Sequence, residues 1–339
     1  MPSTRTTIFF RVILLTVSLA AGLLIGELSL RYWGIYASYR EKIAGSDYIS
    51  PYTMQQKKGW FHIYEPNAQV QINSAEFKHA VQCNSVGLDD VEWTKEKKTR
   101  TRIVVLGDSF AEGTGAPRDS SYAMLLQQLL DSTEVMKCGV GGSDPFYSYI
   151  LLKEKIAAYK PDIIVMGINS SDIYETVLRG GLSRFGADGN THYSKQPPWW
   201  EPYYARYYLV RLFMHKVLGY NRFLFSQQQW QTENNQALNL LCGLTDTTVA
   251  WCRQSNARCI FLFNPLLYEM KQDTTDCQPI ISYAQAKGYQ VINLKTYMQQ
   301  NGVNNSNINR YFWLQDTHNT AEGYALFARA LKEQIESSR

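Results

Sequence analysis

The segment IVVLGDSFAEG, residues 103–113, places four apolar residues directly before Gly107, Asp108 and Ser109. A short, continuously apolar run that ends at a glycine is typical of a strand buried on both faces of a parallel sheet. Two interpretations of the residues after the run are open. They form a plain β-turn, or they hold Ser109 at the end of a strand, where its hydroxyl can attack a ligand.

The same pattern recurs along the rest of the chain. Short apolar strands are predicted at 102–107, 134–142, 162–169, 257–265 and 290–294, with helices between several of them and a closing helix at 321–337. Alternation of helices with continuously apolar strands predicts a parallel sheet that is covered on both faces. Right-handed crossovers then give a three-layer α/β/α sandwich of the flavodoxin-like kind, with five mostly parallel strands.

The composition is that of a folded globular protein. The chain has 339 residues, of which 45% are apolar and 19% are charged, and its formal net charge is +4. These proportions are ordinary for a protein with a packed core. Since no lysine- or arginine-rich block stands out, we do not expect nucleic acid as a partner.

The N-terminus predicts a membrane anchor. Residues 12–30 read VILLTVSLAAGLLIGELSL, with Glu27 as the single charged residue. As a helix this run spans roughly 28 Å, close to the thickness of a bilayer core. We expect a short tail at 1–11, a single-pass transmembrane helix at 12–30 in the cell membrane, and a body exported to the periplasm. A cleaved signal peptide and a buried helix of a soluble protein are the alternatives.

The remainder divides into two parts, the second of which carries an insertion. Residues 31–100 are expected to form a juxtamembrane segment, and residues 101–339 the sheet domain. The domain carries an insertion at 179–230 that is dense in Trp, Tyr and Phe. The insertion is either a small helical cap with its own aromatic core, or a lid or binding wall whose aromatic faces stack on sugars or lie at a membrane surface.

The cysteines indicate no metal site. There are six of them, without a CxxC pair or a Cys/His spacing that metal ligands show. An even number in an exported chain permits disulfides. Buried free thiols are the alternative, above all for Cys138 and Cys259 beside predicted strands. No metal ion and no organic cofactor is expected.

Residues that could take part in catalysis follow the predicted strands. Ser109 follows the first strand, Gly142 ends the second, Asn169 ends the third, and Asp316 and His318 precede the last helix. Ligands of open parallel sheets bind beyond the carboxyl ends of the strands, so these residues are expected to converge on one edge.

Each of these residues has a role in acyl transfer. A serine hydroxyl is a weak nucleophile that needs a base, which His318 can be, and Asp316 can hold the imidazole in the required tautomer. The backbone N–H groups of Ser109 and Gly142 and the side-chain amide of Asn169 are candidate donors to the oxyanion.

Two other acidic residues have structural interpretations. Asp108 is expected to fix the turn before the serine by local hydrogen bonds rather than to act as the base. Ser143 and Asp144 are expected to cap the next helix, with Pro145 at its first position.

Taken in order, the blocks GDSF, CGVGG, GIN and DTHNTAEG resemble those of the SGNH, or GDSL-like, hydrolase family. The resemblance covers about residues 102–331 apart from the insertion. The preceding QCNSVGLDD is similar to a segment of membrane-anchored members of that family.

The resemblance implies catalytic residues at matching positions. Ser109 is implied as nucleophile and backbone donor, Gly142 and Asn169 as the rest of the oxyanion hole, His318 as general base and Asp316 as the acid that orients it.

Two departures from the family pattern bear on this assignment. The third block reads GINSSD instead of Gly-x-Asn-Asp, which places Asp172 two residues late, and an alternative register would put Ser171 where the asparagine is expected. In the last block Asp316 lies one residue closer to His318 than in the common Asp-x-x-His.

From the sequence we therefore expect a membrane-anchored serine esterase that works through an acyl-serine on an acetylated glycan or another small acyl ester. The same acyl-enzyme could pass its acyl group to a glycan hydroxyl, which would make the protein an acyltransferase. A non-catalytic binding or assembly protein that kept the fold is the remaining alternative.

Overall fold

The computed structural model describes residues 4–33, 54–55, 63–187, 191–192, 194–195, 199–218 and 226–337. The chain divides into two compact units. The N-terminal unit consists of Met1–Ile43 with Gln196–Thr232, and the sheet unit consists of Ala44–Lys195 with Glu233–Arg339. Of the predicted juxtamembrane segment 31–100, residues 34–53 and 56–62 lie outside the described residues.

The sheet unit contains the predicted parallel sheet. Its strands are β5 (Thr101–Gly107), β6 (Thr133–Gly139), β7 (Ile163–Ile168), β8 (Arg258–Phe263) and β9 (Gln290–Asn293). They lie in the order β6-β5-β7-β8-β9, and every pairing between neighbours is parallel. The apolar residues 103–106 of β5 are completely buried, as a strand covered on both faces requires. The predicted fold class is thus confirmed.

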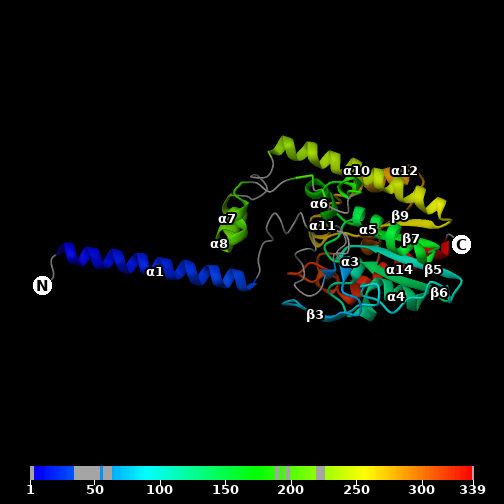
Figure 1. Ribbon diagram of the computed structural model, residues 1–339, viewed down its shortest axis with the longest axis horizontal. Helices are drawn as coiled ribbons and strands as arrows, with labels where there is room; N and C mark the ends of the chain where they lie inside the picture. The colour runs from blue at the N-terminus through cyan, green and yellow to red at the C-terminus, as the bar shows by residue number, and fades with distance from the viewer. Residues whose placement is uncertain are drawn as a thin grey trace. The chain divides into compact units, whose positions relative to one another are not determined.

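Helices cover both faces of this sheet (Figure 1). One face carries α4 (Tyr122–Leu129), α13 (Leu294–Gln300) and α14 (Ala321–Ser337), and the other carries α5 (Pro145–Leu151), α10 (Gln227–Gln254) and α12 (Gln278–Ala286). Side chains of a strand alternate between faces, so Ile103 and Val105 pack with Leu126 and Leu331 in the core on the α4 and α14 side. Three short helices, α3 (Ser109–Glu112), α6 (Ser171–Arg179) and α11 (Leu267–Gln272), follow β5, β7 and β8.

Two small antiparallel pairs precede the sheet: β1 (Met54–Gln55) with β2 (Ile63–Tyr64), and β3 (Gln69–Asn73) with β4 (Lys78–Gln82). The segment after β4 is joined to β6 by Lys137, whose side chain is buried. Its Nζ lies 2.5 Å from Asp89 Oδ2 and donates to the carbonyl of Glu112 at 2.9 Å. A buried ammonium needs such partners, because removing it from water is costly.

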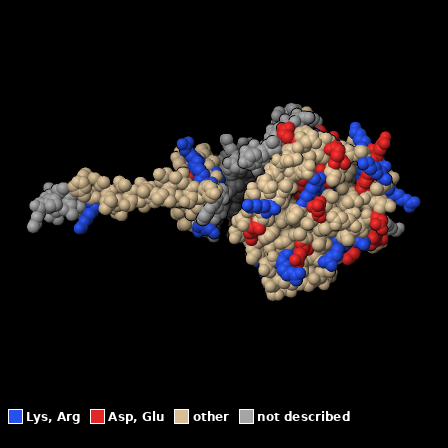
Figure 2. Space-filling model, turned by 90° about the horizontal axis from the view of Figure 1, so that it is seen from below, with Lys and Arg blue, Asp and Glu red and all other residues tan. Residues whose placement is uncertain are grey.

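The N-terminal unit is built on α1 (Thr4–Trp33). Its stretch Ile8–Tyr32 has a mean hydropathy of 2.4 and is long and apolar enough to cross a membrane, a test that a signal sequence also passes. Figure 2 shows the middle of α1 without charged residues on the face in view, whereas charges of both signs are mixed over the sheet unit. Helices α7 (Glu201–Arg206) and α8 (Tyr208–Phe213) and the π-helical turn Met214–Leu218 complete this unit.

The aromatic insertion has a small core of its own. Tyr204 and Met214 are buried, and Trp200 and Val210 pack against them. This core lies within residues 200–214. The cap and the lid both stay predictions for residues 179–230. Other aromatic residues of the insertion, Trp199 and Tyr203 among them, are exposed.

All six cysteines are free thiols. The alternative of disulfide bonds is therefore not realised in this structure. Cys138 is fully buried and Cys259 is partly buried, so both behave as small apolar side chains beside their strands.

Candidate active site

Ser109 is the first residue of α3, directly beyond the end of β5. Asp108 caps this short helix, because its Oδ1 accepts the N–H of Phe110 at 3.0 Å. The expected structural role of Asp108 in the turn is confirmed by this hydrogen bond. The serine is half-buried, which leaves it reachable from solvent.

The position of α3 depends on glycines at the ends of two neighbouring strands. A Cβ added at Gly139 would lie 2.1 Å from the backbone nitrogen of Glu112, and one at Gly107 would lie 3.0 Å from Ala111 Cβ. The helix can therefore rest directly on the backbone of β5 and β6, where any side chain would hold it away.

His318 links Ser109 to an acid. Its Nε2 lies 2.7 Å from Ser109 Oγ, and its Nδ1 lies 2.6 Å from Asp316 Oδ1. When Nδ1–H donates to the carboxylate, the lone pair of Nε2 faces the hydroxyl, which is the tautomer that a base requires. Burial raises the pKa of Asp316, but the hydrogen bond and the charge of His318 lower it more, so this pKa lies below its usual value.

The close spacing of Asp316 and His318 is accommodated by the backbone between them. Thr317 adopts a φ of +75°, which a β-branched residue rarely does. The ring of His318 also packs against Phe110, with centroids 4.8 Å apart. The imidazole is thus oriented both by the acid and by an apolar contact with α3.

Glu76, which the sequence did not single out, holds the loop that carries the acid. It lies in the turn between β3 and β4. Its Oε1 accepts the N–H of Leu314 at 3.0 Å, and its Oε2 accepts the N–H groups of Gln315 and Asp316 at 2.9 and 2.8 Å. One carboxylate thereby fixes three successive residues before His318.

The glycine loop after β6 passes beside the serine. A Cβ at Gly141 would lie 3.9 Å from Ser109 Cβ, and Gly142 has a φ of +70°, in the region that favours glycine. The carbonyl of Gly142 accepts a hydrogen bond from Arg179 at 3.1 Å. The loop that bears Gly142, the expected second oxyanion donor, therefore lies next to the nucleophile and is held by the hydrogen bond from Arg179.

Asp144 ends this loop and caps α5, as expected. Its Oδ1 accepts the N–H groups of Phe146 and Tyr147 at 3.0 and 3.1 Å, and Pro145 is the first residue of the helix. Burial raises the pKa of Asp144, but ion pairs with Arg184 and Arg179 outweigh it and lower the pKa to about 2.

Asn169 is the residue of the GINSSD block that reaches the serine turn. Its Nδ2 donates to Asp108 Oδ2 at 2.8 Å, while its Oδ1 accepts the N–H and the hydroxyl of Ser171 at 2.9 and 2.7 Å. Asp172 Oδ2 accepts the backbone N–H of Asn169 at 2.8 Å. The structure thus places Asn169, and not Ser171, beside Asp108, and the late Asp172 still fixes the asparagine.

Glu112 is a second acid that the sequence did not single out. It is buried three residues after Ser109, and the backbone of Gly141 and the hydroxyl of Tyr64 donate to its carboxylate. Burial and the charge of Asp89 raise its pKa to about 7, against the opposing effect of Lys137 and these hydrogen bonds. It connects α3 to the glycine loop.

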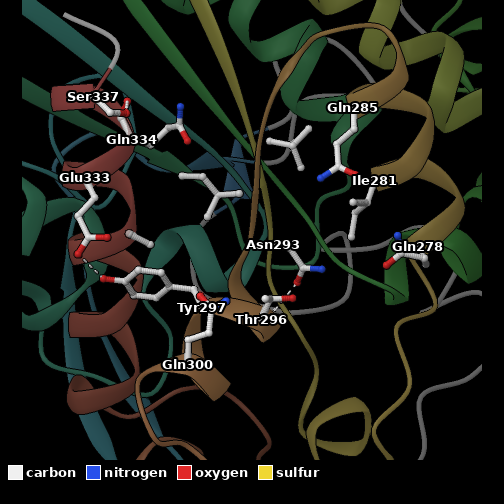
Figure 3. Close-up of a pocket in the computed structure, with 13 residues that line it drawn as sticks. Gln278, Ile281, Gln285, Asn293, Thr296, Tyr297, Gln300, Glu333, Gln334 and Ser337 are labelled. Atoms are coloured by element: carbon white, nitrogen blue, oxygen red, sulfur yellow. Dashed lines mark hydrogen bonds between the residues drawn. The ribbon is translucent and has the colours of Figure 1, made fainter.

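The described residues contain no group of three or more His, Cys, Asp or Glu placed to hold a metal ion. A pocket of about 580 Å³ lies between α12, β9, α13 and α14 (Figure 3). Polar side chains such as Gln278, Asn293 and Tyr297 line it, and Tyr297 donates to Glu333 at 2.7 Å. The serine and the histidine are not among its lining residues, so it is separate from the candidate active site.

No protein-family model matches the chain. No curated protein matches it either. Among solved structures, it is similar to a lipase/acylhydrolase from Enterococcus faecalis, with 12% identity over 70% of this chain and 97% of that one and a TM-score of 0.42. It is also similar to a GDSL-like lipase from Bacteroides thetaiotaomicron (13% identity, 73% and 93% covered, TM-score 0.42). A third is an acetyl xylan esterase from Geobacillus stearothermophilus (13% identity, 71% and 97% covered, TM-score 0.42). At these identities the likeness is one of fold.

Proposed function

We propose that this protein is a membrane-anchored serine esterase that cleaves a small acyl ester, with O-acetylated glycans as the preferred class of substrate. The observation that carries the proposal is the chain of two short hydrogen bonds, 2.7 Å from Ser109 to His318 and 2.6 Å from His318 to Asp316. Ser109 is far from Asp316 and His318 in the sequence, yet the three side chains meet as nucleophile, base and acid, the order that nucleophilic acyl transfer needs.

The first half of the reaction forms an acyl-enzyme. Ser109 Oγ attacks the ester carbonyl carbon while its proton moves to Nε2 of His318, and Asp316 stabilises the imidazolium that results. The carbonyl π electrons move onto oxygen and give a tetrahedral intermediate. When this collapses, the C–O bond to the alcohol breaks, and the alcohol leaves with the proton from Nε2. The acyl group remains on Ser109.

Donors at the strand ends support the charge on the intermediate. The backbone N–H of Ser109, the N–H of Gly142 and the side-chain amide of Asn169 are the proposed group. An amide nitrogen carries two N–H groups, and the hydrogen bond to Asp108 uses one of those of Asn169. A well-placed donor of this kind contributes about 2.7–4 kcal/mol to the stabilisation of the transition state.

The second half of the reaction returns the free enzyme. His318 takes a proton from water, the hydroxide attacks the acyl carbon, and the acid leaves as the proton returns to Ser109 Oγ. If a sugar hydroxyl replaces water in this step, the same residues carry out acyl transfer. We infer hydrolysis because Ser109 and His318 are both partly exposed, which gives water access to the acyl-enzyme.

The anchor is the other part of the proposal. None of the described residues of the 25-residue stretch Ile8–Tyr32 is buried, and the stretch is strongly apolar, which suits a helix surrounded by lipid. We propose that it is retained as a single span and that the sheet unit lies outside the cytoplasm, where acylated polysaccharides are found at the cell surface.

The test uses the full-length protein in detergent. Wild type is expected to hydrolyse p-nitrophenyl acetate and to be labelled by a fluorophosphonate probe, and Ser109→Ala is expected to lose both. Ser120→Ala, which changes a half-buried serine in the turn at residues 118–120, is the matched control and should retain both. A folded wild-type protein that is neither labelled nor active would instead support a non-catalytic binding protein.

Substrate class and reaction type are tested together. Release of acetate from acetylated xylan and mannan is compared with release from short lipid esters, and the products are examined for acetyl groups moved to an added oligosaccharide. Free acetate as the main product supports hydrolysis, whereas an acetylated oligosaccharide as the main product would establish an acyltransferase.

A further inference from the structure

Helix α8 is attached to the C-terminal part of α1 by polar contacts. The carboxylate of Glu27 accepts the backbone N–H groups of Tyr208 and Leu209 at 2.9 and 2.8 Å, and these are the first two residues of α8. Arg31 donates to the carbonyl of Arg206 at 2.8 Å and pairs with Glu27 at 3.2 Å. The first N–H groups of a helix lack partners within it, so Glu27 supplies what α8 requires.

An apolar contact reinforces this attachment. Leu209 lies beside Gly26, because a Cβ at Gly26 would be in ordinary van der Waals contact, 3.6 Å from a terminal methyl group of Leu209. The guanidinium of Arg31 also lies 5.6 Å from the ring of Tyr208. Together these contacts fix α8 against residues 26–31 of α1.

The attachment sets the depth of α8 relative to a membrane. Glu27 lies five residues before Tyr32, the last residue of the apolar stretch Ile8–Tyr32. At 1.5 Å per residue this is about 7–8 Å along the helix axis. Because the 25-residue stretch is longer than a hydrocarbon core of about 30 Å, Glu27 lies a few ångströms inside the edge of a core that α1 spans symmetrically. A carboxylate at that depth is costly unless hydrogen-bonded, and α8 and Arg31 provide the bonds.

Helices α7 and α8 and the residues next to them expose several apolar and aromatic side chains. We call the following six the aromatic surface: Trp199, Tyr203, Tyr207, Phe213, Val217 and Leu218. Trp199 is 84% exposed, Val217 66% and Phe213 51%. Trp and Tyr with neighbouring basic side chains, here Arg206 and Lys216, are the composition of segments that lie at a membrane surface.

We propose that the aromatic surface is immersed in the interface of the bilayer that α1 spans, so that the N-terminal unit holds the membrane by two elements, a span and a surface helix pair. The proposal rests on the anchor part of the proposed function and not on its chemistry. Its occupant is lipid, because α8 is hydrogen-bonded to the C-terminal part of α1, the apolar helix that would itself face the acyl chains.

The test places the photoreactive residue p-benzoylphenylalanine at Phe213 or at Val217 of the full-length protein in vesicles of phosphatidylethanolamine and phosphatidylglycerol. After illumination, mass spectrometry is expected to find a phospholipid adduct at both positions. Leu129, an exposed leucine on α4, is the matched control and should give none. Adducts to a second copy or to another protein, or no more lipid adduct than at Leu129, would overturn the proposal.

Two further measurements separate the possible failures. Extraction of the vesicles with alkaline carbonate reports whether α1 is integrated, and release of the protein by that treatment would overturn both the anchor and the aromatic surface. Hydrolysis of p-nitrophenyl acetate by the same sample reports on the active site, so loss of the esterase proposal is recognised independently. Glu27→Leu should keep the protein in the carbonate pellet but lower the lipid adduct at Phe213, because α8 loses its attachment.

Discussion

Removal of the Glu76 carboxylate should slow the proposed reaction without unfolding the protein. Its two oxygens accept three backbone N–H groups, at 2.8–3.0 Å, from the residues that lead into His318. A hydrogen bond to a charged acceptor contributes about 1.5–3 kcal/mol when sheltered and less when half-exposed, so we assign about 2 kcal/mol to the three together. If Glu76→Ala destabilises the aligned conformation of the loop by that free energy, kcat falls about 30-fold.

The geometry also predicts that a second variant, Glu76→Gln, loses less activity than Glu76→Ala. Oε2 accepts two of the three N–H groups and Oε1 accepts only that of Leu314. In Glu76→Gln the amide oxygen can take the place of Oε2, while the amide NH2 opposes the N–H of Leu314. We expect a loss of about 1 kcal/mol, which is roughly a fivefold decrease in kcat.

The assay is steady-state hydrolysis of p-nitrophenyl acetate by full-length protein in detergent, with the fluorophosphonate-labelled fraction at completion as the measure of folded sites. Glu92→Ala is the control, since Glu92 likewise accepts a backbone N–H, that of Ser85 at 2.9 Å, in the same segment. A kcat for Glu76→Ala within twofold of wild type would refute the reasoning. So would a decrease in kcat that matches a decrease in the labelled fraction.

Four other substitutions have definite expected outcomes. Asp316→Asn lets an amide N–H donate to Nδ1 of His318 and leaves the ring proton on Nε2, facing the serine, so kcat for p-nitrophenyl acetate should fall by roughly 10⁴ while the thermal midpoint changes little. Burial raises the pKa of Glu112 from 4.5 to about 7, so between these pH values the folded state binds a proton that the unfolded state has lost, and the free energy of unfolding should fall by about 3 kcal/mol as pH rises through this window. Thermal midpoints measured across this pH range should fall less for Glu112→Gln than for wild type, and parallel curves would contradict the assignment. Gly139→Ala would place a Cβ 2.1 Å from a backbone nitrogen of α3 and should destabilise the protein by about 3 kcal/mol or abolish probe labelling, whereas Gly243→Ala on α10, with open space at the added Cβ, should stabilise by up to about 1 kcal/mol. Equal thermal midpoints for the two glycine variants would argue against the packing described for α3.

The sheet was predictable because its strands are buried on both faces and therefore leave an unbroken apolar run. Helix α10 was not predicted, since its first half is rich in Gln and Asn. Its buried residues Ala237, Leu241, Leu244 and Thr248 nevertheless recur every three to four positions, and this spacing was the signal available.

The meeting of Ser109, Asp316 and His318 was also predictable, because parallel strands bring their carboxyl ends to one edge. The supports of this site were not. Glu76 lies 240 residues before Asp316, whose backbone N–H it accepts. A single glutamate in a hairpin turn forms no sequence pattern from which such a distant hydrogen-bond partner could be predicted. Glu27 was visible as the one charge in the apolar run 12–30, but its bonds to the N–H groups of α8 depend on tertiary structure alone.

The bare strand ends under α3 have a consequence for how such a protein changes over generations. Where a nucleophile is held by interlocking side chains, each exchange in the core displaces it a little. Here the helix rests on main chain at Gly107 and Gly139, and the main chain is the same whatever apolar residues fill the interior. Most apolar residues of the core can therefore be exchanged in evolution while the reactive hydroxyl keeps its position, provided that these few positions remain glycine.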